Sequence, residues 1–396
     1  MSRKLALPLL LLLLAGLVGG CWDRRELNEL AIVLGAGLDW VEDGRLRLTV
    51  QIARPAAFAG GGEAGAREAP ASWVVSAEGR TVEEAERYLA MKVPRDIYWG
   101  HSIILVYGEE IARRGIGMAD NFFKRKAEPR DTMWVIVAKG EAGEFLETYS
   151  NLSRTSTQAA GQLTRMKTGC TVRFMDFTEM RASKEIQPTA TLVEVKEAGV
   201  TPGPGLEKIS PAHRQVEIAG TAVFREDRMI GWLDAHETRG LLWLKGEAVQ
   251  GAVTVPSPGE PDKEVSIRIQ GGKTKVIPEY DGKNLRFKVM LRVEGELSEQ
   301  QSSENLAKPE MIEALEGEMA GVIQERAAAA LKKAQGEYGV DIFGFGDAFH
   351  RRYKKEWRGL KDRWDEEFAR AEVDIAVEAR IRKIGLITER TSTPEE

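Results

Sequence analysis

The stretch Thr201-Pro202-Gly203-Pro204-Gly205 separates two regions of different pattern and decides how the chain is expected to fold. Proline fixes φ and lacks a backbone donor, and glycine weakens helices and strands, so neither element is expected to continue through it. We therefore predict a return segment and Pro/Gly linker at residues 172–209, followed by a C-terminal domain at residues 210–396.

Upstream of the linker, the chain begins with a hairpin pattern. Apolar runs at residues 31–38 and 46–52 flank Asp43-Gly44. An Asp-Gly pair between such runs is a strong signal for a hairpin turn. The hairpin defines an N-terminal, membrane-proximal domain at residues 21–55, and residues 172–200 are a candidate to complete it.

Between the hairpin and the linker, residues 72–149 alternate strand and helix signals in the order βαβαβα. Thr81-Val82-Glu83-Glu84 has the pattern of a capping box that opens a helix. The strands at residues 103–107 and 134–138 are apolar throughout, which predicts helices on both faces of their sheet. A central α/β domain is therefore expected at residues 56–171.

Downstream of the linker, strand signals come first and helical signals follow. Apolar residues recur on one face of a predicted helix at residues 309–335, and a strand-like run at 373–381 comes near the end. Asp281-Gly282 predicts a second hairpin turn. The predicted class is α+β, with three mixed α/β domains: an N-terminal hairpin-containing domain, a central βαβαβα-like domain and a C-terminal domain of strands followed by long helices. The other strands of the last domain are predicted at residues 218–224, 229–233, 252–255, 265–269 and 285–293.

The composition excludes several classes of protein. The 396 residues include 56 Lys and Arg against 61 Asp and Glu, for a net charge of −5, and 43% are hydrophobic. This hydrophobic content can form a buried core, and mild acidity without a long basic block argues against a nucleic-acid binder. Two cysteines, Cys21 and Cys170, are too few for a disulfide framework or a zinc ribbon, and Cys170 is expected to be a buried small hydrophobe.

Residues 1–20 have the pattern of a secretion signal peptide. Arg3 and Lys4 precede an apolar run at residues 5–18, which is shorter than the roughly 20 residues of a membrane-spanning helix. Val18-Gly19-Gly20 places small residues directly before Cys21, as in a bacterial lipobox, where the cysteine thiol carries the lipid. Two acyl chains give stable anchoring. The alternative is an ordinary signal peptide followed by a chance cysteine.

The residues after Cys21 leave almost no flexible tether before the first apolar strand. The N-terminal domain is therefore expected to lie against the bilayer. Trp22, Arg24 and Arg25 are candidates for a membrane or partner surface, and a solvated charge pair is the plainer interpretation of the two arginines.

The sequence contains no complete motif of a catalytic, phosphate-binding or metal site. The four histidines lie far apart and form no HxH or HExxH motif, so no metal site and no cofactor are expected. Gly344-Phe345-Gly346 matches only the start of a phosphate loop and is interpreted as turn or packing glycines. No nucleophile motif is present, and we predict no catalytic residues and no enzyme. A membrane-surface hydrolase stays open as an alternative at this point, because the two carboxylates of a glycosidase need no local spacing.

An aromatic stripe follows this glycine pair at helical spacing. Such a stripe usually packs into a core, and this interpretation is favoured. The interleaved basic residues leave a membrane or partner surface as the alternative, with Tyr353 and Trp357 as its candidate residues. The stripe comprises Phe345, Phe349, Tyr353, Trp357, Leu360, Trp364 and Phe368.

Several segments resemble the Ger(x)C family, the lipoprotein C subunits of the nutrient germinant receptors of endospore-forming bacteria. The resemblance extends almost end to end. It is carried by residues 21–27 (CWDRREL), 93–101 (VPRDIYWGH), 220–224 (GTAVF), 231–233 (GWL), 238–246 (TRGLLWLKG) and 341–346 (DIFGFG), with His350, Tyr353 and Trp357.

The resemblance implies a non-enzymatic lipoprotein of three mixed α/β domains that acts in nutrient-triggered germination. It implies lipidation of Cys21, a place on the outer face of the spore inner membrane, and assembly with the A and B membrane subunits. The alternative is a lipoprotein that binds solute for a transporter. The missing tether, and the lack of two similar α/β lobes around a ligand, argue against that alternative.

Overall fold

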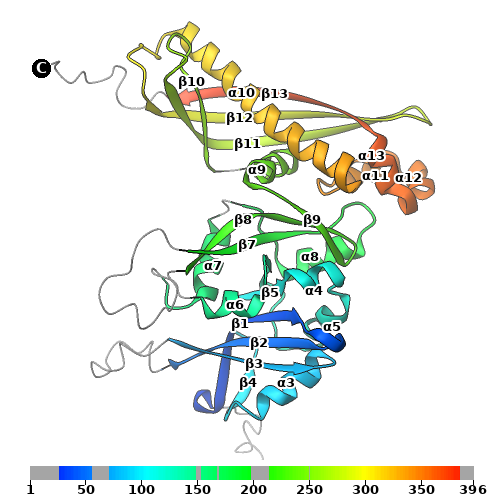
Figure 1. Ribbon diagram of the computed structural model, residues 1–396. Coiled ribbons are helices and arrows are strands. Elements are labelled where there is room, and N and C mark those ends of the chain that lie inside the picture. Colours follow the sequence, from blue (N-terminus) through cyan, green and yellow to red (C-terminus); the bar gives the residue numbers. More distant parts are fainter. Residues whose placement is uncertain are drawn as a thin grey trace, which may run out of the picture.

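A computed structural model of the chain describes residues 26–55, 71–148, 153–166, 169–197, 214–248 and 250–383 (Figure 1). The described residues form two β-sheets, one of nine strands and one of four. Figure 1 shows the larger sheet in the lower half of the view and the smaller sheet, crossed by one long helix, above it. The predicted α+β class is confirmed.

Parallel strands occupy the centre of the larger sheet, and antiparallel strands extend it on both sides. The strand order is β3-β2-β1-β5-β6-β7-β8-β9, in which β1, β5, β6 and β7 are parallel. The short strand β4 pairs in parallel with the first residues of β1. The strands are β1 (Leu30–Trp40), β2 (Leu46–Ala53), β3 (Ser72–Gly79), β4 (Asp96–Tyr98), β5 (Ile104–Gly108), β6 (Trp134–Ala138), β7 (Thr189–Glu197), β8 (Arg214–Arg225) and β9 (Arg228–Leu233).

Helices cover both faces of this sheet, as the apolar central strands predict. On one face, Ile104 and Ile136 pack with Phe145 of α6 and Ala160 of α7. The alternate residues of the same strands enter the main core with the helices of the other face. The helices are α3 (Val82–Ala90), α4 (Glu109–Arg114), α5 (Gly117–Arg125), α6 (Ala142–Glu147), α7 (Ser156–Arg165) and α8 (Phe174–Ala182).

Local turn and cap signals are largely confirmed. Asp43 and Gly44 both have positive φ, 64° and 76°, as the hairpin turn between β1 and β2 requires. At the start of α3, the Glu84 backbone N–H donates to Thr81 Oγ1 over 3.1 Å, as predicted. The Glu84 carboxylate accepts instead from the backbone N–H of Arg80, so the predicted capping box is only half formed.

The smaller sheet has the order β10-β11-β12-β13, with β13 parallel to β12. Its strands alternate buried and exposed residues, and α10 packs on the buried face through Leu315, Met319 and Ile323. The elements are α9 (Ala235–Lys245), β10 (Ala252–Pro256), β11 (Glu264–Tyr280), β12 (Leu285–Gln300), α10 (Pro309–Lys332), the π-helix η4 (Lys333–Tyr338), α11 (Phe345–Arg352), α12 (Lys354–Leu360), the 3-10 turn η5 (Lys361–Arg363), α13 (Trp364–Arg370) and β13 (Glu372–Lys383).

The predicted domain boundaries divide the larger sheet. Strands β1 and β2, expected in a separate domain at residues 21–55, pair with strands of the expected central domain. Strand β7, from the segment expected to complete that N-terminal domain, pairs with β6 and β8 instead. Strands β8 and β9 also belong to this sheet, so the change of sheet comes after Leu233 and not at residue 210.

The reason is that the Pro/Gly stretch lies in the connection between β7 and β8. Antiparallel neighbours can be joined by a loop of almost any length, so a segment that breaks both helix and strand need not separate two domains. The Thr201–Gly205 stretch itself lies outside the described residues.

The backbones of helices α9 and α10 approach each other closely at Gly240, and this contact links the two sheets. A Cβ atom on Gly240 would lie 2.0 Å from the Arg326 carbonyl oxygen and 2.9 Å from Ala330 Cβ. We expect Gly240→Ala to lower the free energy of unfolding by about 1–3 kcal/mol, because α9 must move away from α10. Gly321→Ala, on α10 where an added Cβ meets no neighbour, should instead stabilise the chain by up to about 1 kcal/mol. Urea unfolding of both variants tests this, and equal effects would contradict the close packing.

Candidate functional site

The residues predicted for the membrane anchor, Cys21, Trp22, Arg24 and Arg25, lie outside the described residues. The first described element is the 3-10 turn η1 (Leu27–Glu29), which leads directly into β1. The first residue of β1 pairs with Asp96 of β4. The first described residues therefore lie beside β4, which Figure 1 places, with α3, far from the smaller sheet. Within the described ranges, no helix combines the length and apolarity that a bilayer crossing requires.

The aromatic stripe lies in the core, as favoured from sequence, but it does not form one helix. The backbone leaves helical geometry at Tyr353 (φ −120°, ψ 59°) and at Arg363 (φ −125°, ψ 23°), so the stripe folds into three short helices. Trp357 is only 5% exposed and packs against Trp364 and His350, with ring centroids 5.2 Å apart in each case. The burial of Trp357 argues against its alternative interpretation as a membrane or partner surface.

Tyr353 is half-buried and contacts the end of β11. Its hydroxyl oxygen accepts a hydrogen bond from the backbone N–H of Tyr280 over 3.2 Å, and the two rings lie 6.2 Å apart. Of the two stripe residues predicted as a surface, Tyr353 and Trp357, only Tyr353 keeps partial exposure, and it also has a packing role.

Asp341 organises the loop before α11 and is completely buried. Its carboxylate accepts four hydrogen bonds of 2.7–3.1 Å. Burial raises the pKa of Asp341 to about 6, against the opposing effect of these donors. The donors are the backbone N–H groups of Phe343, Gly344 and Gly346 and the indole N–H of Trp364.

This loop joins the two halves of the molecule. The backbone N–H of Gln187, just before β7, donates to the Asp341 carbonyl oxygen over 2.7 Å. A Cβ on Gly346 would lie 2.4 Å from the Glu185 carbonyl oxygen, so only glycine allows this approach. His350 of α11 pairs with Glu185. The glycines of the DIFGFG segment are thus turn and packing glycines, as predicted, with φ of 83° at Gly344.

A second set of contacts joins η4 to the β8–β9 hairpin. The Tyr338 hydroxyl donates to the Trp232 carbonyl oxygen over 2.8 Å and accepts from the Trp232 backbone N–H over 3.0 Å. The Arg225 guanidinium donates to the Tyr338 carbonyl oxygen over 2.6 Å. These backbone-directed bonds fix the edge of the larger sheet against the C-terminal part. We call the Asp341 loop and these η4 contacts together the junction.

A hollow of about 430 Å³ opens at the junction between residues 184–187 and α13. Its walls carry both signs of charge, including Lys184, Arg225, Glu226 and Asp365. Several of these groups already have partners within the hollow: Gln187 donates to Asp365 over 3.0 Å, and its side-chain oxygen accepts from the Glu226 backbone N–H. Part of the polar capacity of the lining is therefore already used within the protein.

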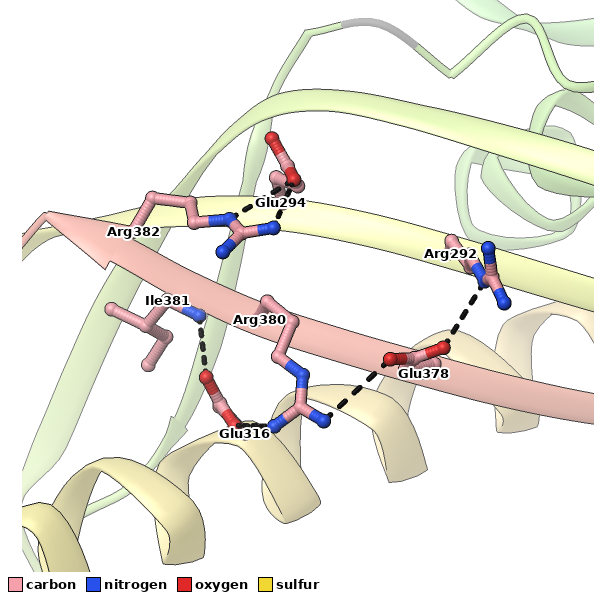
Figure 2. Close-up of polar contacts among 7 residues, drawn as sticks. All are labelled: Arg292, Glu294, Glu316, Glu378, Arg380, Ile381 and Arg382. Carbon is pink, nitrogen blue, oxygen red and sulfur yellow. Dashed lines mark hydrogen bonds and ion pairs between the residues drawn. The ribbon is translucent and has the colours of Figure 1, made fainter.

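The outer face of the smaller sheet carries paired charges along its edge (Figure 2). Arg292 pairs with Glu378 across β12 and β13 over 3.1 Å, and Arg382 pairs with Glu294 over 2.7 Å. From α10, Glu316 accepts the Ile381 backbone N–H over 2.8 Å and also pairs with Arg380. The charges largely cancel, and Glu316 occupies a donor that the free edge of β13 would otherwise present to another strand.

The VPRDIYWGH segment lies beside a buried polar group in the larger-sheet half. Trp99 is completely buried, and its indole N–H donates to Glu86 over 2.6 Å. Lys126 donates to the same carboxylate over 2.7 Å. A hollow of about 610 Å³, lined by Arg87, Arg95 and these charged groups, opens at the surface here. His101, at the end of the segment, is exposed.

The described residues include no group of three His, Cys, Asp or Glu side chains arranged to hold a metal ion. Cys170 is 1% exposed and burial raises the pKa of its thiol, so it is the small buried hydrophobe that was predicted. Sequence reasoning missed the roles of Asp341 and Glu86. An acidic residue within a glycine- and aromatic-rich segment is the signal that could have indicated Asp341.

Two family models match the chain in succession. "Spore germination protein N-terminal domain" matches residues 23–195, and "Spore germination B3/GerAC like, C-terminal" matches residues 219–385. Apart from Cys21 and Trp22, which precede the first match, the two models together include the segments that carry the sequence resemblance, the Asp341 loop among them.

Curated relatives match over almost the whole chain. Spore germination protein KC of Bacillus subtilis (strain 168) is 28% identical, over 98% of this chain and 97% of its own length. Spore germination protein B3 of the same organism is 23% identical, over 93% and 95%. The crystal structure of the GerBC protein has a similar fold, with a TM-score of 0.56 and 18% identity over 88% of this chain and 97% of GerBC.

Proposed function

The chain belongs to the Ger(x)C family of spore germination proteins, and from this membership we propose that it is the lipid-anchored C subunit of a germinant receptor. The observation that carries the proposal is the succession of the two family models over residues 23–195 and 219–385. The similarity to protein KC over nearly the full length of both chains supports it.

In this role the chain acts without catalysis, through contacts with other proteins. The junction supports such a role because its hydrogen bonds connect the part of the chain that forms the larger sheet to the part that forms the smaller one. Such a connection can hold two surfaces in a fixed relation, which a subunit of an assembly requires. The partners in the proposal are the A and B membrane subunits of the receptor, at the outer face of the spore inner membrane.

A solute-binding lipoprotein of a transporter is the alternative. That class encloses its ligand between two similar α/β lobes. Here the described residues form a nine-stranded mixed sheet and a four-stranded sheet of different order, joined by the junction. This asymmetry favours the receptor subunit.

The anchor is tested by Cys21→Ala. We expect this variant to appear in the soluble fraction of disrupted spores, because the only thiol at the lipobox junction is lost. Germination in response to nutrient should slow with it. Cys170→Ala, which removes the buried cysteine, is the control and should remain with the membranes. A Cys21→Ala chain that stays membrane-bound with full germination would defeat the proposed anchor.

A further inference from the structure

Two large apolar side chains stand out from the surface at the end of the molecule where the first described residues lie. Leu27 in η1 is 69% exposed, and Met91, directly after α3, is 82% exposed. Among the described residues these are the two most exposed large hydrophobic side chains. A side chain this exposed contributes little to the packing of the fold.

The sheet brings the two residues to the same end of the molecule. Strands β1 and β4 run parallel, with Leu30 opposite Asp96. The segments that precede these strands, residues 27–29 and 91–95, must therefore leave the sheet from the same end. Pro94 is also exposed and adds to the apolar surface. Figure 1 places β4 and α3 at the end of the molecule opposite the smaller sheet.

The charges around this end favour apolar contact over electrostatic attraction. Arg87 and Arg95 are exposed and line the neighbouring hollow, and long basic side chains can reach lipid headgroups while their stems cover apolar surface. Glu29 and Asp96 are exposed at the same end, so these four charges cancel. Affinity for a bilayer must therefore come from the inserted apolar groups.

The short length of chain between the proposed lipid site at Cys21 and the first described residue indicates that these exposed side chains contact the bilayer. Glu26 is the fifth residue after Cys21, and about 3.6 Å per extended residue allows at most about 18 Å between them. With Cys21 held at the bilayer, Leu27 follows Glu26 directly and lies at most a few ångströms beyond this distance from the headgroups.

We propose that Leu27, Met91 and Pro94, together with Arg87 and Arg95, form a contact surface that enters the interfacial layer of a phospholipid bilayer. This inference rests on the proposed lipid anchor and adds to it. The anchor holds the chain at the membrane, and this contact surface sets its orientation, with the smaller sheet pointing away from the bilayer.

The experiment uses a fluorescent reporter of polarity at single positions. Leu27→Cys and Met91→Cys are each labelled with a nitrobenzoxadiazole maleimide in the full lipidated chain. Lipid consumes the Cys21 thiol and Cys170 is 1% exposed, so the introduced cysteine is the reactive one. Met290→Cys is the matched control, since Met290 is an exposed methionine (41%) on β12 of the smaller sheet.

In vesicles of phosphatidylethanolamine and phosphatidylglycerol, emission from positions 27 and 91 should shift to shorter wavelength. It should also be quenched by lipids brominated in their acyl chains, while position 290 keeps the spectrum of a label in water. If all three labels remain water-like on a chain that floats with the vesicles, the contact surface is overturned and the anchor stands. If positions 27 and 91 become shielded only after the receptor's other subunits are added, the surface binds protein and the bilayer proposal fails.

A chain that does not float with the vesicles would overturn the anchor instead. In that case the same three positions are labelled in mature chains that carry Cys21→Ser, so that the introduced cysteine is again the reactive one, and an N-terminal histidine tag holds these chains to nickel-chelating lipid in the same vesicles. A blue shift at 27 and 91 would still support the contact surface, and its absence would overturn it.

Discussion

Asp341→Ala should lower the free energy of unfolding by about 5 kcal/mol, more than a typical substitution in this chain. The reason is that the carboxylate is the acceptor for four buried donors, three backbone N–H groups and the indole N–H of Trp364. Each donor left without an acceptor costs roughly 1–3 kcal/mol, and partial access of water reduces the total. Denaturant unfolding measures the loss.

Asp347→Asn is the matched control for this prediction. Asp347 lies on the next helix, its side chain is 45% exposed, and its partner is Arg351 in the following turn. Loss of such an exposed pair should change the unfolding free energy by less than about 1 kcal/mol. If Asp341→Ala is no more destabilising than Asp347→Asn, the Asp341 loop does not hold the junction together.

The raised pKa of Asp341 also predicts the direction in which the free energy of unfolding changes with pH. Its pKa is about 6 in the folded chain, above the ordinary value of 3.8, so the folded chain binds this proton more tightly than the unfolded chain does. The contribution of Asp341 to stability is therefore full below about pH 4 and declines as pH rises towards and past 6. The difference in unfolding free energy between wild type and Asp341→Ala should shrink over that range, and a difference that grows with pH would contradict the assignment.

Trp357→Ala should be the other strongly destabilising substitution, by about 3–5 kcal/mol. Trp357 is 5% exposed and packs against Trp364, Phe349 and His350, so truncation leaves a cavity inside the three-helix cluster. The melting temperature should fall by several degrees. Calorimetry of the mature chain without its lipid provides the measurement.

Arg358→Ala serves as the comparison for Trp357→Ala, because Arg358 is exposed on the same short helix. It should leave the melting temperature nearly unchanged. An unchanged melting temperature for Trp357→Ala, together with lost partner binding, would restore the surface interpretation that the burial of Trp357 argues against.

The parts of the fold that were predictable depend on local chemistry. Asp43-Gly44 supplies two residues that tolerate positive φ, and the apolar spacing of α10 is visible within one helix, so both were predicted from sequence. Sheet membership depends on pairing between distant residues. Nothing local shows that β8 pairs with β7 across the Pro/Gly stretch, and for that reason the change of sheet after Leu233 could not be predicted.

In the candidate site, too, the features that depend on local sequence were predicted and those that depend on distant contacts were not. A stripe at helical spacing correctly indicated a buried aromatic core, but the breaks at Tyr353 and Arg363 arise because the cluster must fold back on β11 and β12. The role of Asp341 depends on donors that converge only after the loop closes. The proposed lipid site at Cys21, by contrast, is predicted from its neighbouring residues alone, although it lies outside the described residues.

The most direct test of the account is isolation of the tagged chain from detergent-solubilised spore membranes, with mass spectrometry of the mature N-terminal peptide and of the co-purifying proteins. The account predicts a diacylglycerol mass on Cys21 and co-purification of the A and B membrane subunits. An unmodified N-terminus on a soluble chain, or transporter permeases as the partners, would contradict it.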